Sequence, residues 1–575
     1  MKVYWLKIYL YIISCILILC DIPALGQQVR LDNLKEQFSR KNLFHINGGL
    51  SANSVFYIGN NSNRQPFMWV ISGNVNINLF NQINLPFSCN FNNMGNGYSY
   101  PTLPNRLSLH PSYKWVTAHV GDVSMNFSPY TLSGHQFTGG GIELKPENSP
   151  LKTQLMFGQL LKKTEYDSLN FTGIVAYKRM GYGVKLNYEK DRFLLGMSIF
   201  HAHDDIGSLK WQPDSLQIYP QSNLAISSDA TLRLIENLTF SIEYGFSCLT
   251  RDSRLPSTQT DLGTWLLIRN SSTIQYHAIK AGINYLLKKN SFGLGYERID
   301  PDYQTLGGYY FTNDLENFTF SYARPFWEDK INFSINVGMQ HDNLEQNKKE
   351  QTHRWVMAAN LNIVPSEHWN CSISYSSFQS YTNIKSQFDY INAINKYENQ
   401  DTLDFTQLSQ NVNTNISYDW SVEGSRNHNL NFNLSFQEAA DKRGGIIAPG
   451  NASQFYNLAA SYVLLFVSSA IQLTASGNLT YNKIAGQGVT TWGPTIGAST
   501  KCLKQKMTVS ISSSYNTSSN NGQQTGSIIN ARSNVSWRIF KKHAATLSIV
   551  YQNRAVPMKS AVSDFTTTLN YTYSF

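Results

Sequence analysis

Apolar and polar side chains alternate along many stretches of this chain. In residues 565–575, polar Thr, Asn and Ser alternate with Phe565, Leu569, Tyr571, Tyr573 and Phe575. The same period of two recurs in residues 330–340, 429–436, 470–481 and 506–515. Alternation over about ten residues predicts β-strands that have one apolar and one polar face.

Connections of two lengths alternate between these strands. Long ones include the segment between Tyr381 and Leu408. Short ones stand at residues 81–82, 189–192, 235–237, 288–290, 327–330, 365–368, 502–505 and 540–543. Tight turns at one end and longer loops at the other are typical of transmembrane β-barrels, with the turns in the periplasm and the loops outside the cell.

The strand count supports this interpretation. Residues 44–575 divide into about 26 segments (24–26) if residues 106–121 are split at Pro111–Ser112, and both ends then lie on the turn side, as expected for a bacterial barrel. With that split, every short turn falls on one side and every long loop on the other. The predicted fold is all-β: a closed antiparallel transmembrane barrel, because closure leaves no sheet edge exposed to lipid.

Composition narrows the class of protein. Charged residues make up 15% of the chain and aromatic residues 13%, whereas charged residues are about 25% of a typical soluble domain. After the first residues, no apolar run reaches the ~18 residues that a spanning helix needs. Cys89, Cys248, Cys371 and Cys502 are scattered and form no CxxC pair, so neither a zinc site nor a disulfide framework is indicated.

The N-terminus has the features of an export signal. Lys2 and Lys7 precede an apolar run over residues 8–20, and the small residues Ala24 and Gly26 precede an expected cut before Gln27. We therefore expect a signal peptide over residues 1–26, a short periplasmic lead over 27–43, and the barrel over 44–575. Loss of the signal lowers the formal charge from +9 to +8, since two lysines and one aspartate leave.

The last strand resembles a known family feature. A final Phe575 with Tyr571 and Tyr573 on the same face is similar to the C-terminal signal by which the barrel assembly machinery recognises bacterial outer-membrane barrels. The Gln-led mature start and the Asn- and Tyr-rich composition resemble barrels of Bacteroidota. The resemblance implies an integral protein of the outer membrane, in contact with its lipid.

More specific families fit less well. TonB-dependent transporters carry a plug domain ahead of the barrel, for which residues 27–43 are too short. Ushers insert a folded plug within a loop, and no loop here has that length. The lipopolysaccharide translocon is similar in strand number but adds a periplasmic domain that has no counterpart in this sequence.

Two groups of residues are candidates for the barrel interior. Residues 121–144 resemble the Gly-Asp and Gly-rich hairpins of wide export barrels, and they form either a lumen constriction or a structural hairpin with a glycine bend. The constriction would involve Gly121, Asp122, Gly139, Gly140 and Gly141. Charged residues in the register of small polar neighbours either line a conduction path or form ion pairs that hold the wall: Lys185, Arg233, Glu243, Lys280 and Glu297.

Two further candidates lie in the expected outer loops. Tyr303, Tyr309 and Tyr310 could contact a sugar or a partner protein, or form an interface girdle or a small core within the loop. The segment 201–205, HAHDD, has metal-capable side chains, but its register points His201 and His203 outward, which favours a rim without metal. No catalytic or nucleotide-binding motif is found. We expect no enzyme, no cofactor and no nucleic-acid partner.

These observations leave functions of different classes open. The first is a channel or translocation pore whose lumen is occupied by loops or by a partner protein, because wider barrels with an empty lumen would leak. The second is a structural or surface-binding barrel that docks a partner protein or glycan without conducting. A hydrolase is disfavoured, since no Ser/His or Asp/His constellation stands at the rim.

Overall fold

The computed structural model describes most of the chain from Phe44 onward. The residues it describes are 44–59, 65–80, 82–93, 106–166, 175–211, 213–257, 269–309, 313–346, 353–377, 380–382, 406–422, 424–443, 446–484 and 487–575. The signal peptide and lead expected over residues 1–43 lie outside these ranges, so both stay predictions.

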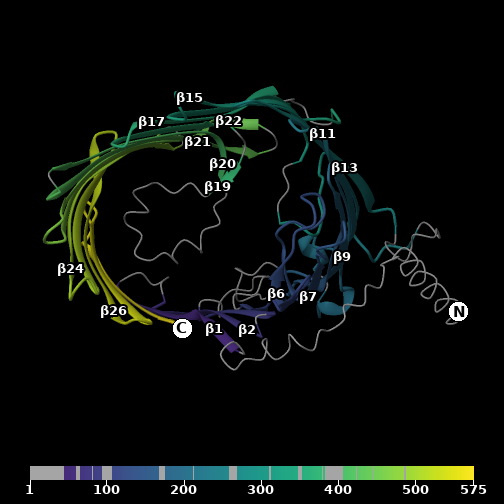
Figure 1. Ribbon diagram of the computed structural model, residues 1–575, viewed down its shortest axis with the longest axis horizontal. Coiled ribbons are helices and arrows are strands. Elements are labelled where there is room, and N and C mark those ends of the chain that lie inside the picture. The colour runs from purple at the N-terminus through teal and green to yellow at the C-terminus, as the bar shows by residue number, and fades with distance from the viewer. Residues whose placement is uncertain are drawn as a thin grey trace, which may run out of the picture.

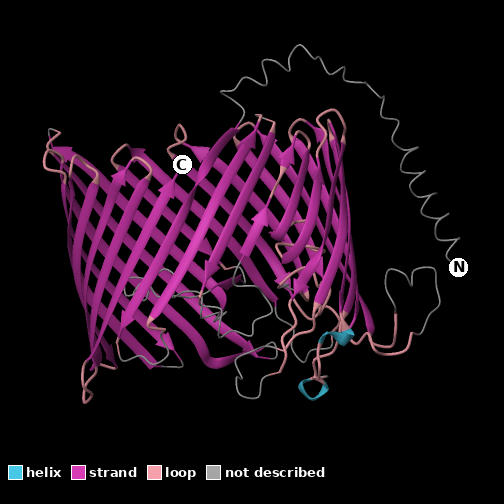
Figure 2. Ribbon diagram, turned by 90° about the horizontal axis from the view of Figure 1, so that it is seen from below, coloured by secondary structure: helices cyan, strands magenta, loops and turns pink. Residues whose placement is uncertain are grey.

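The strands form one closed antiparallel barrel, seen end-on as a ring in Figure 1 and from the side in Figure 2. β1 (Phe44–Ile58) pairs on one side with β2 (Phe67–Leu79) and on the other with the last strand, β28 (Val562–Ser574). At this seam Gly48 and Phe575 exchange two backbone hydrogen bonds of 3.1 Å. The first and last strands therefore close the ring directly.

The remaining strands follow in chain order around the ring. They are β3 (Ile83–Asn92), β4 (Arg106–Leu109), β5 (Ser112–Tyr113), β6 (Val116–Ser124), β7 (Gln136–Leu144), β8 (Leu151–Leu161), β9 (Arg179–Lys190), β10 (Phe193–Asp204), β11 (Ser222–Ile235), β12 (Leu238–Thr250), β13 (Thr273–Leu287), β14 (Asn290–Ile299), β15 (Leu315–Phe326), β16 (Ile331–His341), β17 (His353–Ser366), β18 (Trp369–Ser376), β19 (Ser380–Thr382), β20 (Thr406–Val422), β21 (Arg426–Arg443), β22 (Ile446–Phe466), β23 (Ile471–Ile484), β24 (Gln487–Cys502), β25 (Met507–Asn520), β26 (Gln523–Phe540) and β27 (His543–Ala555).

These 28 strand segments make 26 positions in the ring, because β4 with β5, and β18 with β19, each serve as one strand. The predicted strand number is confirmed, but one predicted boundary is wrong. The turn lies at Lys114–Trp115, between β5 and β6, and not at Pro111–Ser112. Pro111 instead interrupts the strand that β4 and β5 share, since proline has no N–H to donate to a neighbouring strand.

The two ends of the barrel differ as predicted over most of the ring. Long connections such as 125–135, 205–221 and 300–314 all leave from one end, which we call the loop end. The last third departs from the prediction: β25 ends at Asn520 and β26 begins at Gln523, although this connection is at the loop end. Asn521 and Gly522 both have positive φ, as a two-residue hairpin turn requires. In this last third, the chain forms longer strands in place of a long loop, and β22 has 21 residues.

Side-chain exposure follows the period of two. In β10, Leu195 and Met197 are exposed on the outside of the barrel while Ser198 and Phe200 are buried on the inside. In β21, Phe432 and Leu434 are exposed between inward Asn431 and Asn433. An apolar outer face is what a barrel needs where lipid surrounds it.

The hydrophobic core does not lie between two sheets. Among the described residues, the larger cluster of buried apolar side chains has 18 members, from loop 125–135, loop 300–309 and the inner faces of strands from β6 to β15. Both loops fold back into the ring beside these strands (Figure 1). The helical elements described are two short 3-10 turns, η3 (Ile206–Ser208) and η4 (Asp214–Leu216), and none of the described helices is long and apolar enough to span a bilayer.

Candidate lumen site

Loop 125–135, which joins β6 to β7, packs on the inner wall of the barrel. Four of its apolar side chains are 3% exposed or less: Met125, Phe127, Tyr130 and Leu132. The loop also closes on itself, because the Phe127 N–H donates to the Leu132 carbonyl at 2.9 Å. Its apolar sequence is explained by this burial, which an exposed surface loop would not have.

Glycines on the wall make room for the loop. A Cβ atom at Gly245 in β12 would lie 2.4 Å from Cβ of Tyr130, and one at Gly141 in β7 would lie 2.4 Å from the sulfur of Met125. A larger residue at Gly245 would therefore displace the loop at Tyr130, and one at Gly141 would displace the Met125 side chain.

The candidate constriction residues fall on both faces of the wall. Gly121, Gly139 and Gly141 share the inner register with buried Val123, whereas Gly140 and Asp122 alternate with them. Asp122 therefore does not point into the lumen, which corrects its predicted placement. Its carboxylate instead accepts hydrogen bonds from the Leu107 N–H at 3.0 Å and the Thr138 hydroxyl at 2.6 Å.

Three of the five candidate lumen charges hold the loop. The Ser128 hydroxyl donates to Glu243 at 2.5 Å, and the Tyr130 hydroxyl donates to Glu297 at 3.2 Å. The ammonium group of Lys185 donates to the carbonyl of Phe127. The rest of the inner wall is mostly polar and uncharged. Charged residues at these three positions are explained by the loop, because a hydrogen bond is stronger when one partner is charged.

The other two charges lie apart from the loop. Lys280 in β13 stands 3.8 Å from Glu297, and its side chain is 61% exposed to the lumen. Arg233 lies near the turn end of β11 and is exposed, so the structure does not bring it together with the other four.

The tyrosines of loop 300–309 point inward and not toward an outer partner. Tyr303 is fully buried and donates to the carbonyl of Tyr130 at 2.8 Å. Tyr309 stacks on His135 with ring centroids 4.1 Å apart and is 44% exposed. Tyr303 and Tyr309 thus pack on loop 125–135 and not within a core of their own loop, while Tyr310 lies outside the described residues.

A side-chain hydrogen bond and a backbone bridge fasten this second loop to the first. Thr305 donates to the Thr131 carbonyl at 2.9 Å, and Leu132 forms a parallel bridge with Gly307. We call loops 125–135 and 300–309 together the inner loop pair.

Burial keeps three titratable side chains of the inner loop pair neutral. It raises the pKa of the Tyr130 phenol, and the Glu297 and Glu243 carboxylates add to the rise. Burial likewise raises the pKa of Tyr303 and lowers the pKa of His135 to about 4. At neutral pH these three groups therefore carry no charge.

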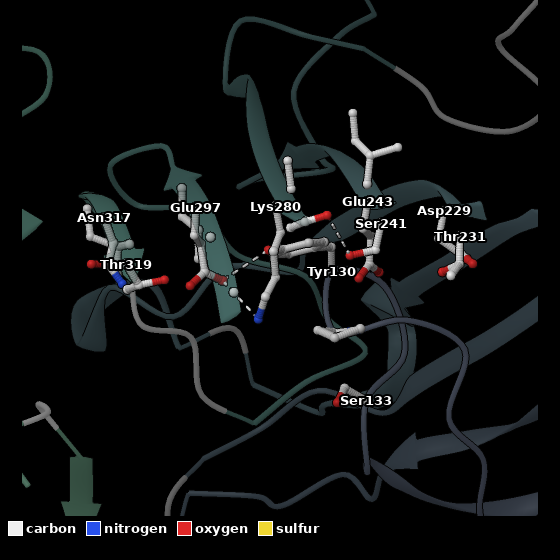
Figure 3. Close-up of a pocket in the computed structure, with 18 of the residues that line it drawn as sticks. Tyr130, Ser133, Asp229, Thr231, Ser241, Glu243, Lys280, Glu297, Asn317 and Thr319 are labelled. Atoms are coloured by element: carbon white, nitrogen blue, oxygen red, sulfur yellow. Dashed lines mark hydrogen bonds and ion pairs between the residues drawn. The ribbon is translucent and has the colours of Figure 1, made fainter. Parts of the chain in front are cut away.

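A cavity of about 1050 Å³ lies on the lumen side of the inner loop pair. Tyr130 and Tyr309 contribute to it from the loops, and the wall contributes Lys185 of β9 and residues of β11 to β16. Figure 3 shows Lys280 and Tyr130 both reaching Glu297 across this cavity, with Asn317 and Thr319 farther along the wall. Four of the five candidate lumen charges line it, together with Asp229.

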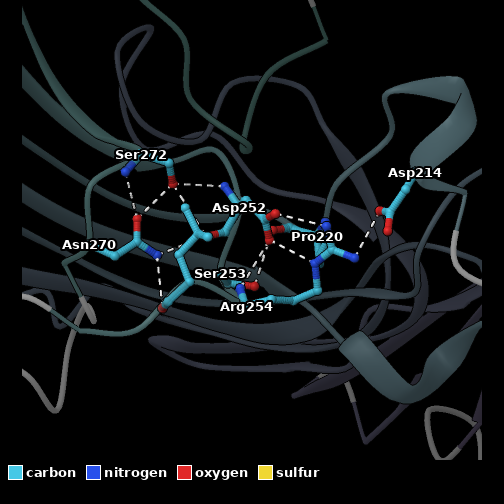
Figure 4. A network of polar contacts seen from close by, with 8 residues as sticks. Asp214, Pro220, Asp252, Ser253, Arg254, Asn270 and Ser272 are labelled. Carbon is cyan, nitrogen blue, oxygen red and sulfur yellow. Dashed lines mark hydrogen bonds and ion pairs between the residues drawn. The ribbon is translucent and has the colours of Figure 1, made fainter.

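A polar network that sequence patterns did not reveal joins the outer loops (Figure 4). Arg254 lies 2.8 Å from both Asp252 in its own loop and Asp214 in the loop after β10. Asn270 donates to the Asp252 carbonyl at 2.8 Å, and Ser253 donates to Pro220. Its members are separated in sequence by up to 58 positions (272 − 214), so no local motif marks them.

This network should weaken in acid. The Arg254 side chain lowers the pKa of Asp252 from its ordinary value of 3.8. The ion pair therefore stabilises the loops fully above that value, and the stabilisation is lost as the pH falls through the lowered pKa. We expect pepsin to cut residues 205–221 and 251–257 increasingly faster as the pH falls from about 5 to about 2, relative to the same loops in Asp252→Asn.

The matched control is Asp329→Asn, which removes an exposed ion pair with Lys289 at the opposite end of the barrel. It should leave cleavage of the outer loops unchanged. If Asp252→Asn and the unaltered protein were cut at equal rates at pH 5, the network would not hold the loops.

The segment 201–205 has structural partners. Asp204 forms an ion pair with Arg179 at 2.7 Å, and Asp205 caps η3. His201 and His203 lie side by side on the outward register, with ring centroids 5.5 Å apart. Within the described ranges, no group of three or more His, Cys, Asp or Glu side chains could hold a metal ion, and Cys89, Cys248, Cys371 and Cys502 are all free.

Comparisons with known proteins extend to the fold alone. No protein-family model and no curated protein matches the chain. Similar solved structures include a chain of the E. coli P pilus tip assembly intermediate PapC–PapD–PapK–PapG, with 10% identity over 91% of this chain and 60% of that one, and a TM-score of 0.42. A ferric enterobactin receptor of Pseudomonas aeruginosa has 12% identity over 92% of this chain and 81% of its own, with a TM-score of 0.39.

The P pilus usher PapC, described as a translocation pore, is a third such structure. Its identity is 10% over 93% of this chain and 99% of its own, with a TM-score of 0.30. The chain thus spans three fifths of the first of these structures and nearly all of the third. At such scores no substrate or partner carries over.

Proposed function

We propose that this chain is an integral outer-membrane barrel that acts as a channel or translocation pore, with its lumen narrowed by the inner loop pair. Its apolar outer face and polar inner face support a place in a lipid bilayer. The proposal includes export of the precursor by a signal peptide over residues 1–26. It also includes recognition by the barrel assembly machinery through Tyr571, Tyr573 and Phe575. A Bacteroidota origin belongs to it as well. No catalytic role is proposed.

The observation that carries the proposal is that the ring of strands is wide, whereas the inner loop pair covers only part of its inner wall. Barrels of 16–18 strands already hold an aqueous channel, and this one has 26 positions. The described loops cover the inner wall only around β6 to β15. On β16, on β21 from Asn427 to Gln437 and on β25, the inner register is Asn, Ser, Thr, Gly and Gln, which suits water and polar solutes.

A plug or surface protein could share the rest of the lumen. Usher structures such as the pilus assembly intermediate contain partner chains, but that is a property of those proteins. For this chain, a partner is part of the proposal, and mild-detergent purification from native membranes would reveal it as a stoichiometric companion.

Planar bilayer recording tests the function. We expect the purified barrel to give discrete current steps smaller than those of an empty barrel of this circumference, because the inner loop pair occupies part of the cross-section. A complete lack of current would favour the non-conducting surface-binding barrel. A permanently open, very large pore would contradict a narrowed lumen.

A further inference from the structure

We infer that the cavity beside the inner loop pair is a binding subsite for a neutral oligosaccharide, which would be the cargo of the barrel. This inference rests on the proposed channel function and deepens it by naming a substrate class. The site consists of Tyr309, Lys280 and a stretch of wall that carries hydroxyl and amide groups: Ser241, Asn284, Asn317, Thr319 and Ser321.

The floor of the cavity is built from glycine. Gly282 in β13 stands directly opposite Gly295 in β14, and both line the cavity together with Gly293. A Cβ at Gly295 would lie 2.5 Å from the Thr319 hydroxyl, and one at Gly293 would lie 2.3 Å from the Ser321 hydroxyl. The hydroxyl groups therefore lie over bare backbone, which deepens the wall at this point.

Hydrogen-bonding capacity is left over at the site. The amide oxygen of Asn317 is buried without a partner among the described residues. A buried acceptor without a hydrogen bond is unfavourable, so it favours a bound donor. A sugar hydroxyl can donate and accept at once, which matches a wall that mixes Ser, Thr and Asn.

The charges at the site disfavour an ionic ligand. Glu243, Glu297 and Lys185 already bind the loop. Lys280 and Asp229 remain toward the cavity with opposite signs. The lining thus intersperses two cationic side chains, Lys185 and Lys280, with the three carboxylates of Asp229, Glu243 and Glu297. It presents no field of a single sign to a solute, unlike a site that selects anions or cations.

A peptide fits the wall less well than a sugar. The strands around the cavity are paired on both sides, so they leave no free edge to which a peptide could add as a strand. The half-exposed ring of Tyr309 offers an apolar face beside polar groups, which suits a sugar ring. A volume of about 1050 Å³ is just above the ~300–1,000 Å³ of small-molecule sites, enough for several sugar units.

Calorimetric titration of the full-length barrel in detergent tests the inference. The probes are maltohexaose, cellohexaose and xylohexaose, beside hexalysine, hexaglutamate and an uncharged hexapeptide. We expect saturable binding of at least one hexasaccharide and about tenfold weaker binding in Asn317→Leu, as for loss of one hydrogen bond. The control is Asn433→Leu, the same change on the inner face of β21 outside the cavity, and it should bind as the unaltered protein does.

The outcomes separate this inference from the proposed function. Hexasaccharide binding without any ionic current would refute the channel and keep the subsite. Normal current with no hexasaccharide binding, or with peptide binding that Asn317→Leu weakens, would overturn the subsite and leave the channel. Equal weakening in Asn317→Leu and Asn433→Leu would also overturn it, since the cavity would then not be the place of binding.

Discussion

Deleting residues 573–575 is expected to abolish the folded, membrane-inserted barrel. The deletion removes the seam contacts of Phe575 with Gly48 and of Tyr573 with Leu50. In lipid each backbone group left without a partner costs roughly 2–7 kcal/mol, against a total stability of about 5–15 kcal/mol. If the aromatic end is also the assembly signal, insertion fails before the seam can form. Heat-modifiable migration on a gel, with protease protection of the barrel in cells, measures the folded fraction.

A deletion of equal length at the opposite end of the same hairpin is the control. Residues 557–559 connect β27 to β28 outside the paired strands, and Met558 there is fully exposed. Their removal should leave most of the barrel folded. Normal amounts of folded protein after removal of residues 573–575 would show that neither the seam nor a signal depends on them.

Replacing residues 126–134 by a short glycine linker should raise the single-channel conductance several-fold. The loop carries Phe127, Tyr130 and Leu132 into the lumen, so its removal widens the path without touching any strand. The wall hydrogen bonds remain, and heat-modifiable migration should therefore still report a folded barrel.

A smaller change should act in the same direction. Gly245→Phe places its side chain where Tyr130 now packs, whereas Gly497→Phe adds the same ring to the inner face of β24, where the nearest atoms lie 3.4 Å from a built Cβ. We expect noisier and larger currents from the first variant and none of this from the second. Unchanged conductance after loss of the loop would mean that it does not narrow the conduction path.

The barrel was predictable because its signal is repeated along the chain. Each strand alternates apolar and polar residues, and the turns such as 288–290 mark the register. The misplaced boundary at Pro111 has a local cause: proline usually ends a strand, but here Ser112 and Tyr113 resume pairing with β3 and β6 after it. The short hairpin at Asn521–Gly522 broke the expected asymmetry of loops because the neighbouring strands are longer.

The site was predictable only in part. The register placed Lys185, Glu243, Lys280 and Glu297 inside, and the structure shows all four at one cavity. The sequence does not show that these charged residues bind loop 125–135, because residues in contact, such as Ser128 and Glu243, are 115 positions apart. Two features of the sequence were consistent with this packing: the apolar residues of loop 125–135 and the glycine at position 245. Neither predicts the packing until the loop is known to fold back on the wall.

A disulfide trap tests the central claim, that loop 125–135 lies on the inner wall, most directly. The hydroxyl oxygens of Thr131 and Ser198 are 2.9 Å apart and buried, so the two side chains are in direct contact, as a disulfide between cysteines at these positions requires. In a chain whose cysteines within residues 44–575 are replaced by serine, Thr131→Cys with Ser198→Cys should cross-link spontaneously in the folded barrel, as mass spectrometry of the joined peptides would show. Thr131→Cys with Ser512→Cys, on the inner face of β25, should not. A cross-link in the second pair as readily as in the first, or in neither, would contradict the account.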